Sequence, residues 1–192
     1  EVLAARRVVL DPRPLSAWRL AMPRAVMLDA LEPAVATAFE RAVAALRAGG
    51  AHIDEIDLSA LTDAAALQRG GGLSAAESWA WHRRRLADRE QQYDPRVALR
   101  IRRGEAFGAA DYLDLLDDRR RWIVSTEVAL AGIDALLSPT VPIVAPYLQP
   151  LLDDDEAFFA ANALLLRNPS LVNLLDGCAL SLPGHRNGEW PV

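Results

Sequence analysis

Residues 18–58 read WRLAMPRAVMLDALEPAVATAFERAVAALRAGGAHIDEIDL, and this stretch predicts a strand, a helix and a second strand. The apolar run of residues 18–22 is typical of a buried strand. Pro33 opens the helix, because the missing N–H of proline has no partner in a first helical turn. The glycines at 49–50 end the helix, and residues 52–58 predict the second strand. A strand–helix–strand order implies a parallel or mixed sheet.

The chain beyond this unit is mostly helical in pattern. Apolar residues at helical spacing predict helices at residues 62–69, 75–91, 95–103 and 111–131. Short strands are expected at residues 133–137 and 179–182, and between them lie a proline-rich loop, a helix capped by the acidic residues 153–155, and a separate helical turn from Pro169 to Leu175. The fold class predicted is α/β, a partial mixed sheet flanked by several helices, in a single domain that spans residues 1–192.

Composition excludes several kinds of chemistry. The 192 residues carry 21 Lys plus Arg, and all of these are arginine. A chain without lysine cannot by itself complete a P-loop, a Schiff base or a Ser–Lys dyad. A net charge of −5 argues against nucleic acid as a partner, because phosphate binding depends on an excess of basic residues.

Location is predicted from the cysteine count and from the longest apolar stretch. The single cysteine, Cys178, cannot form an internal disulfide, which suits the reducing cytoplasm. The longest uncharged run, residues 135–152, contains four prolines and cannot form a membrane helix. We therefore expect a cytoplasmic protein that does not enter a membrane.

Three charged or glycine-rich features could bind a ligand, and a plainer interpretation competes with each. The glycines at 70–72 could hold a phosphate, but they lack GxGxxG spacing, which favours a simple helix connection. The arginine clusters at 83–85, 100–103 and 119–121 could contact nucleic acid or an acidic partner, although nearby carboxylates favour a solvated face. The aspartates at 153–155 lack the glycine and distant glutamate of a calcium loop, so capping is favoured.

One set of side chains could form a nucleophilic site. Cys178 could supply a thiolate, His185 a base and Asp176 an orienting carboxylate. Against this, Cys178 directly precedes the apolar run at 179–182, where a small buried residue is expected. The three histidines show no metal-ligand spacing among themselves or with the cysteine, so we expect neither a metal nor a cofactor.

Two C-terminal stretches carry more specific motifs. Residues 134–146 read DALLSPTVPIVAP, and residues 173–183 read NLLDGCALSLP. Together they resemble the C-terminal half of the amidase signature family, which has D-x-LL-x-PT-x-P-x-x-AP followed by N-x-x-G-x-P-A-x-S-x-P. Residues 18–51 and 94–112 resemble further parts of the family in the same order, so the likeness covers nearly the whole chain from about residue 15. The departure is Cys178, where the family usually has proline.

The resemblance implies a hydrolase that cleaves amide C–N bonds with a Ser–cis-Ser–Lys triad. In the family this triad lies in the N-terminal half, in a lysine-bearing region and a GSSGGS segment. Neither is present here, and no two serines of this sequence are adjacent, so no catalytic residue is assigned. The loop at 140–142 resembles one near the family's pocket, and the segment from Asn173 resembles one behind the active site. Thr140, Pro142 and Asn173 are therefore the candidate substrate-binding residues.

We expect the chain to be a truncated, C-terminal part of an amidase-like hydrolase. It would supply scaffold and one pocket wall for a small-molecule amide substrate and would be inactive by itself, and a homodimer is compatible with the sequence. The alternative is a non-enzymatic binding or assembly module that retains the amidase fold. A third hypothesis is a cysteine hydrolase built on Cys178. The sequence does not identify the substrate.

Overall fold

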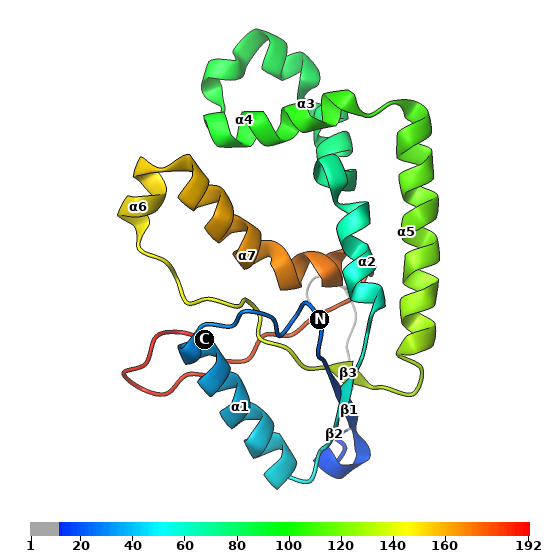
Figure 1. Ribbon diagram of the computed structural model, residues 1–192, viewed down its shortest axis with the longest axis vertical. Coiled ribbons are helices and arrows are strands. Elements are labelled where there is room, and N and C mark those ends of the chain that lie inside the picture. Colours follow the sequence, from blue (N-terminus) through cyan, green and yellow to red (C-terminus); the bar gives the residue numbers. More distant parts are fainter. Residues whose placement is uncertain (1–11) are drawn as a thin grey trace.

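A small parallel sheet forms one end of the structure, a computed structural model that describes residues 12–192 (Figure 1). Strand β1 (Arg19–Pro23) lies in the centre, with β2 (His52–Ile56) on one side and β3 (Ala135–Leu136) on the other. Helix α1 (Pro33–Ala48) connects β1 to β2. The strand–helix–strand unit predicted from residues 18–58 is confirmed, and so is the α/β fold class.

Strand β1 is central because it is apolar on both faces. Four of its five residues, Leu20 to Pro23, are buried, and Ala21 has no exposed surface. Burial on both faces is characteristic of strands in parallel sheets. The approach to β3 is fixed by Asp134, whose carboxylate accepts the Arg19 N–H at 2.8 Å and whose own N–H donates to the Arg19 carbonyl at 2.8 Å.

Helices make up most of the remaining chain. They are α2 (Ala60–Leu67), α3 (Gly72–Arg89), α4 (Pro95–Arg102), α5 (Ala109–Ala129), α6 (Leu148–Asp153) and α7 (Asp155–Leu174), with 3-10 turns η1 (Leu15–Ala17), η2 (Arg69–Gly71), η3 (Glu90–Gln92) and η4 (Arg103–Ala106). Helices α2 and α5 pack side by side, whereas α3 and α4 lie at the end of the molecule opposite the sheet (Figure 1). The four helices predicted between residues 62 and 131 are confirmed, with ends shifted by a few residues.

The main core lies where α2, α5 and α7 meet. Its buried side chains are Met27, Leu58, Leu61, Ala64, Leu67, Trp122 and Leu171. The Trp122 ring can be buried without leaving its polar N–H unpaired, because the indole N–H donates to the Ala60 carbonyl at 2.5 Å. A second, smaller cluster of Leu86, Ala98 and Ile101 packs α3 against α4.

The C-terminal segment returns to α1, beside which the C-terminus lies in Figure 1. Arg41 of α1 donates to both carboxylate oxygens of Glu189, at 2.8 and 2.6 Å, and to the Gly184 carbonyl at 3.1 Å. These hydrogen bonds from Arg41, together with the backbone N–H of Arg186, lower the pKa of Glu189 to about 2. The pair therefore ties residues 184–189 to α1.

Three sequence predictions for the C-terminal part are wrong. Residues 179–182 form no strand, because no strand among residues 12–192 pairs with them, and Leu180 and Leu182 are 84% and 75% exposed. Cys178 is exposed rather than buried. Pro169 lies inside α7 rather than at the start of a separate turn.

Two further points concern the segment before α7. The short helix α6 occupies part of the stretch that the prolines marked as a loop. The capping prediction for residues 153–155 is confirmed, because the Asp154 carboxylate accepts the Glu156 N–H at 2.8 Å at the start of α7.

Candidate functional site

Asn168 holds the proline-rich loop against α7. The residue is 2% exposed, and its side-chain amide donates to the Met27 carbonyl at 3.0 Å and to the Pro139 carbonyl at 2.8 Å. One buried side chain therefore joins α7 to two loops that follow β1 and β3. The sequence pattern did not single out Asn168, although a polar residue directly before Pro169 in an apolar helix is a usable signal.

The loop that Asn168 anchors contains two of the three candidate residues. The Thr140 hydroxyl shares a hydrogen bond of 2.7 Å with the Ser181 hydroxyl, so the two C-terminal motif stretches meet there. Pro142 is fully buried, and its carbonyl accepts the Glu32 N–H at 2.9 Å. The Glu32 carboxylate in turn accepts the Val144 N–H at 2.9 Å. These contacts fix the extended path of the loop on both sides of Pro142.

Asn173, the third candidate, lies in a different place. It is exposed on α7 and lines a cavity of about 1220 Å³ that lies between α7 and the helices α3 and α4. Thr140 and Pro142 do not line this cavity. The structure therefore does not bring the three predicted residues together around one void.

The lining of this cavity is basic. It includes the glycine turn at 70–72 and four arginines, Arg100, Arg103, Arg119 and Arg167. The only carboxylate that the described part of the chain contributes to the lining is that of Glu77, which accepts a hydrogen bond of 3.0 Å from the Tyr112 hydroxyl. That hydrogen bond, with some burial, raises the pKa of Tyr112.

Two of these arginines have protein partners. Arg119 donates to the Leu174 carbonyl at 2.9 Å and pairs with Asp176. Arg167 donates to the Asn168 side-chain oxygen at 3.1 Å, and partial burial lowers the pKa of Arg167. Both therefore help to hold α7 in place.

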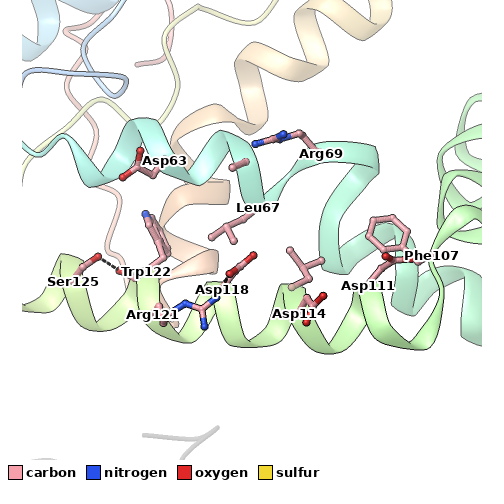
Figure 2. A pocket seen from close by; sticks show the side chains of 12 residues that line it. Asp63, Leu67, Arg69, Phe107, Asp111, Asp114, Asp118, Arg121, Trp122 and Ser125 are labelled. Carbon is pink, nitrogen blue, oxygen red and sulfur yellow. Dashed lines mark hydrogen bonds and ion pairs between the residues drawn. The ribbon is translucent and has the colours of Figure 1, made fainter.

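A second cavity of about 690 Å³ lies between α2 and α5 (Figure 2). Its lining includes the side chains of Asp63, Asp111, Asp114, Asp118, Arg69 and Arg121, which Figure 2 labels. Two of the carboxylates already have structural roles, because Asp111 accepts the Gly108 N–H at 2.8 Å at the start of α5 and Asp118 pairs with Arg121. Within residues 12–192, no group of three ligating side chains is placed to hold a metal ion.

The nucleophilic set considered from the sequence is not assembled. Asp176 pairs with Arg119, and the His185 Nδ1 accepts the Val192 N–H at 3.3 Å. Cys178 is exposed and lines neither cavity. The Asp176 carboxylate and the His185 Nδ1 are thus bound to other groups, and no hydrogen bond joins Cys178, His185 and Asp176 to one another within residues 12–192.

The family model for amidases matches residues 11–192. The chain belongs to the amidase family. It is 30% identical over 165 residues to 2-amino-5-chloromuconic acid deaminase of Comamonas testosteroni, covering 86% of this chain and 36% of that protein. It is also 30% identical over 189 residues to a glutamyl-tRNA(Gln) amidotransferase polypeptide of Haloarcula marismortui, covering 86% of this chain and 44% of that polypeptide.

Solved structures support the same family assignment. A variant of Kluyveromyces lactis allophanate hydrolase superposes with a TM-score of 0.78 at 28% identity, over 91% of this chain and 28% of that one. A crystal structure of an amidase superposes with a TM-score of 0.77 at 25% identity, over 99% of this chain and 43% of that one. The resemblance read from the motifs is confirmed.

This amidase-family chain spans 36% and 44% of the length of the two curated relatives named above. Its fold is that of hydrolases that act on amide C–N bonds. Among residues 12–192, no helix is both long and apolar enough to cross a membrane.

Proposed function

We propose that this chain is the C-terminal part of an amidase-like hydrolase, that it supplies scaffold and one wall of the substrate pocket, and that it hydrolyses no amide by itself. The observation that carries the proposal is the amidase match over residues 11–192 in a sequence without lysine and without adjacent serines. The resemblance assigns the Ser–cis-Ser–Lys triad to the other half of the family's fold. An arginine cannot replace the lysine, because its guanidinium does not lose a proton at working pH.

The cavity between α3, α4 and α7 supports the role of a pocket wall. Its volume of about 1220 Å³ exceeds the roughly 300–1,000 Å³ that is usual for small-molecule sites, which suits a cleft that another part of the protein narrows. Asn173 is the predicted residue that faces this space, and its amide can both donate and accept. Thr140 and Pro142 would act by ordering the neighbouring loop.

The substrate class proposed is a small amide. The relatives named above include a deaminase of 2-amino-5-chloromuconic acid and an allophanate hydrolase, and both names give a small nitrogen-containing compound as the substrate. A cytoplasmic location, a homodimer and the absence of nucleic acid as a partner stay predictions.

The alternative is a non-enzymatic module that retains the amidase fold and assembles with another chain. Leu180 and Leu182 are exposed on an extended segment, which favours a second polypeptide segment that covers them. Such a contact fits both the hydrolase and the non-enzymatic module. Reading the coding sequence upstream of Glu1 separates the two. A GSSGG-type segment preceded by a lysine codon supports the hydrolase, whereas a start codon close to Glu1 overturns it and supports the module.

The third hypothesis, a cysteine hydrolase on Cys178, is tested by alkylation. A catalytic thiolate with a depressed pKa reacts rapidly near neutral pH. Because neither Asp176 nor His185 forms a hydrogen bond with Cys178 in the described range, we expect Cys178 to react as slowly as an ordinary exposed thiol.

A further inference from the structure

Helix α5 carries apolar side chains on two opposite faces. Trp122 and Thr126 are its buried residues, and they lie on the inner face. Val124 follows Trp122 by two residues, and two residues turn an α-helix by about 200°. Val124 therefore lies on the outer face, where its side chain is exposed. A surface helix usually has a single apolar stripe, so a second one on the solvent side indicates a contact surface.

The outer face of α5 is uncovered within the described part of the chain. It consists of residues that follow one another at helical spacings, which are Leu113, Asp117, Arg120, Val124 and Val128. All of them are exposed within residues 12–192. In Figure 1, α5 is the outermost helix on its side of the molecule, and α2 lies beside its inner side. None of these residues lines either cavity, so this face is separate from the proposed pocket wall.

The outer face has the same kinds of side chain in the same order from both ends. Leu113 precedes the acidic Asp117 by four positions. Val124 follows the basic Arg120 by four positions. The two charged residues are neighbours in the middle of the face, since the Arg120 guanidinium donates to the Asp117 carboxylate at 2.7 Å. In either direction the face is therefore aliphatic, then charged, then oppositely charged, then aliphatic.

This order is complementary to its own reverse. When two copies of α5 lie antiparallel with the midpoint between residues 118 and 119, Leu113 of one copy faces Val124 of the other. In the same register, Asp117 of one copy faces Arg120 of the other. A parallel pair would instead oppose each charge to its own copy, which like-charge repulsion disfavours. The helix dipoles also favour the antiparallel pair.

We propose that the outer face of α5 is the interface of a homodimer, in which two copies of this chain pair antiparallel about a two-fold axis between residues 118 and 119. A two-fold interface uses the same patch on both subunits, so each contact occurs twice. Val128 extends the contact, because in this register it faces the small residue Ala109 at the start of the other α5. The charges in the middle fix the register of the aliphatic ends. The inference goes beyond the proposed function, because it concerns a surface outside the pocket wall.

The first test is sedimentation velocity of the 192-residue chain at increasing concentration. We expect a monomer–dimer equilibrium with a dissociation constant of roughly 1–100 µM, because contact along one helix is at the small end of protein interfaces. Val124→Asp should weaken dimerisation at least about tenfold, since the two-fold axis places an unpaired charge in the interface twice. The control is Leu99→Asp on α4, because Val124 and Leu99 are similarly exposed, at 55% and 51%. This control should leave the dissociation constant within about twofold, and circular dichroism checks that each variant is folded.

The second test exchanges the charges in the middle of the face. In Asp117→Arg, two arginines meet across the axis, and in Arg120→Asp two aspartates meet, so each variant alone should dimerise at least about tenfold more weakly than the native chain. An equimolar mixture of the two variants places arginine opposite aspartate at both positions. We therefore expect the mixture to form mixed dimers with an affinity within about threefold of the native one. A loss of helix stability in either variant would not be repaired by mixing.

Three outcomes would overturn the assignment. The first is a native chain that stays monomeric up to about 500 µM, which would mean that the occupant of this face is not a second copy. The second is an equal dissociation constant in Val124→Asp and Leu99→Asp, which would place the dimer contact on another surface. The third is a mixture of Asp117→Arg and Arg120→Asp that dimerises no better than either variant alone, which would refute the antiparallel pairing.

Discussion

Gly104 is the point at which α3 and η4 come into backbone contact, and Gly104→Ala should disrupt it. An added Cβ would lie 2.0 Å from the Ala75 carbonyl oxygen and 2.6 Å from the Trp79 Cβ. Ordinary contacts begin near 3.4 Å, so the two elements must separate by more than an ångström. The Ala75 carbonyl cannot rotate away as a flexible side chain would, and we expect a loss of about 3 kcal/mol, the upper end of the usual cost of overpacking.

The assay is thermal unfolding followed by circular dichroism. At roughly 2–4 °C per kcal/mol for a chain of this size, Gly104→Ala should lower Tm by about 6–12 °C. The matched control is Gly184→Ala, whose Cβ would meet its nearest atom at 3.6 Å, and it should shift Tm by no more than about 1–2 °C. Equal Tm values for the two variants would refute the claim that this close approach holds α3 against η4.

Three further predictions concern the core, the loop anchor and the C-terminal tie. Leu61→Ala should lower the free energy of unfolding by about 2–5 kcal/mol in urea titrations, because Leu61 is 1% exposed, and a loss below about 1 kcal/mol would contradict its place in the core. Asn168→Ala should cost about 2–4 kcal/mol, because it leaves the Pro139 carbonyl without its hydrogen bond and the Met27 carbonyl with only the 3.4 Å hydrogen bond from Arg167. The exposed Asn173→Ala should cost under about 0.5 kcal/mol, and similar losses in the two variants would disprove the anchor. Pairing with Arg41 lowers the pKa of Glu189 from 4.5 to about 2, so the stability that this ion pair adds is fully present above pH 4.5 and disappears as the pH falls towards 2. The Tm measured across this pH range should therefore fall less in Glu189→Gln than in the native sequence. Identical pH profiles would argue against a stabilising pair between Arg41 and Glu189.

Local signals predicted the first unit of the fold well. Pro33 and the glycine pair at 49–50 bound α1, and the apolar run before them became the buried central strand. Each of these signals acts within a few residues, through a missing N–H, a tolerated backbone angle or a continuous apolar face. Such signals work whatever packs around them.

Predictions that depended on distant neighbours failed. Residues 179–182 have the composition of a strand, but a strand also needs a partner for its backbone groups, and none of residues 12–192 supplies one. Pro169 is a strong helix-breaking signal, yet α7 continues through it, and Asn168 and Leu171 on either side are buried in tertiary contacts. Tertiary packing thus outweighed local preference at this proline.

The candidate site was predictable only in part. Asn173 was singled out by its motif and does face a cavity, whereas the roles of Thr140 and Pro142 in substrate binding stay predictions. The cluster at 100–103 looked like one solvated face, because sequence spacing does not tell which arginines meet carboxylates. It is the packing of α4 that separates Arg102, paired with Glu90, from Arg100, which borders the cavity.

The most direct test of the central claim is ammonia release from simple amides by the purified 192-residue chain. The chain has no lysine and no adjacent serines, so we expect no release above the buffer background, either from the native sequence or from Cys178→Ala. Turnover by both proteins would contradict the account outright. Turnover that disappears in Cys178→Ala would contradict it equally and would assign the reaction to the exposed thiol.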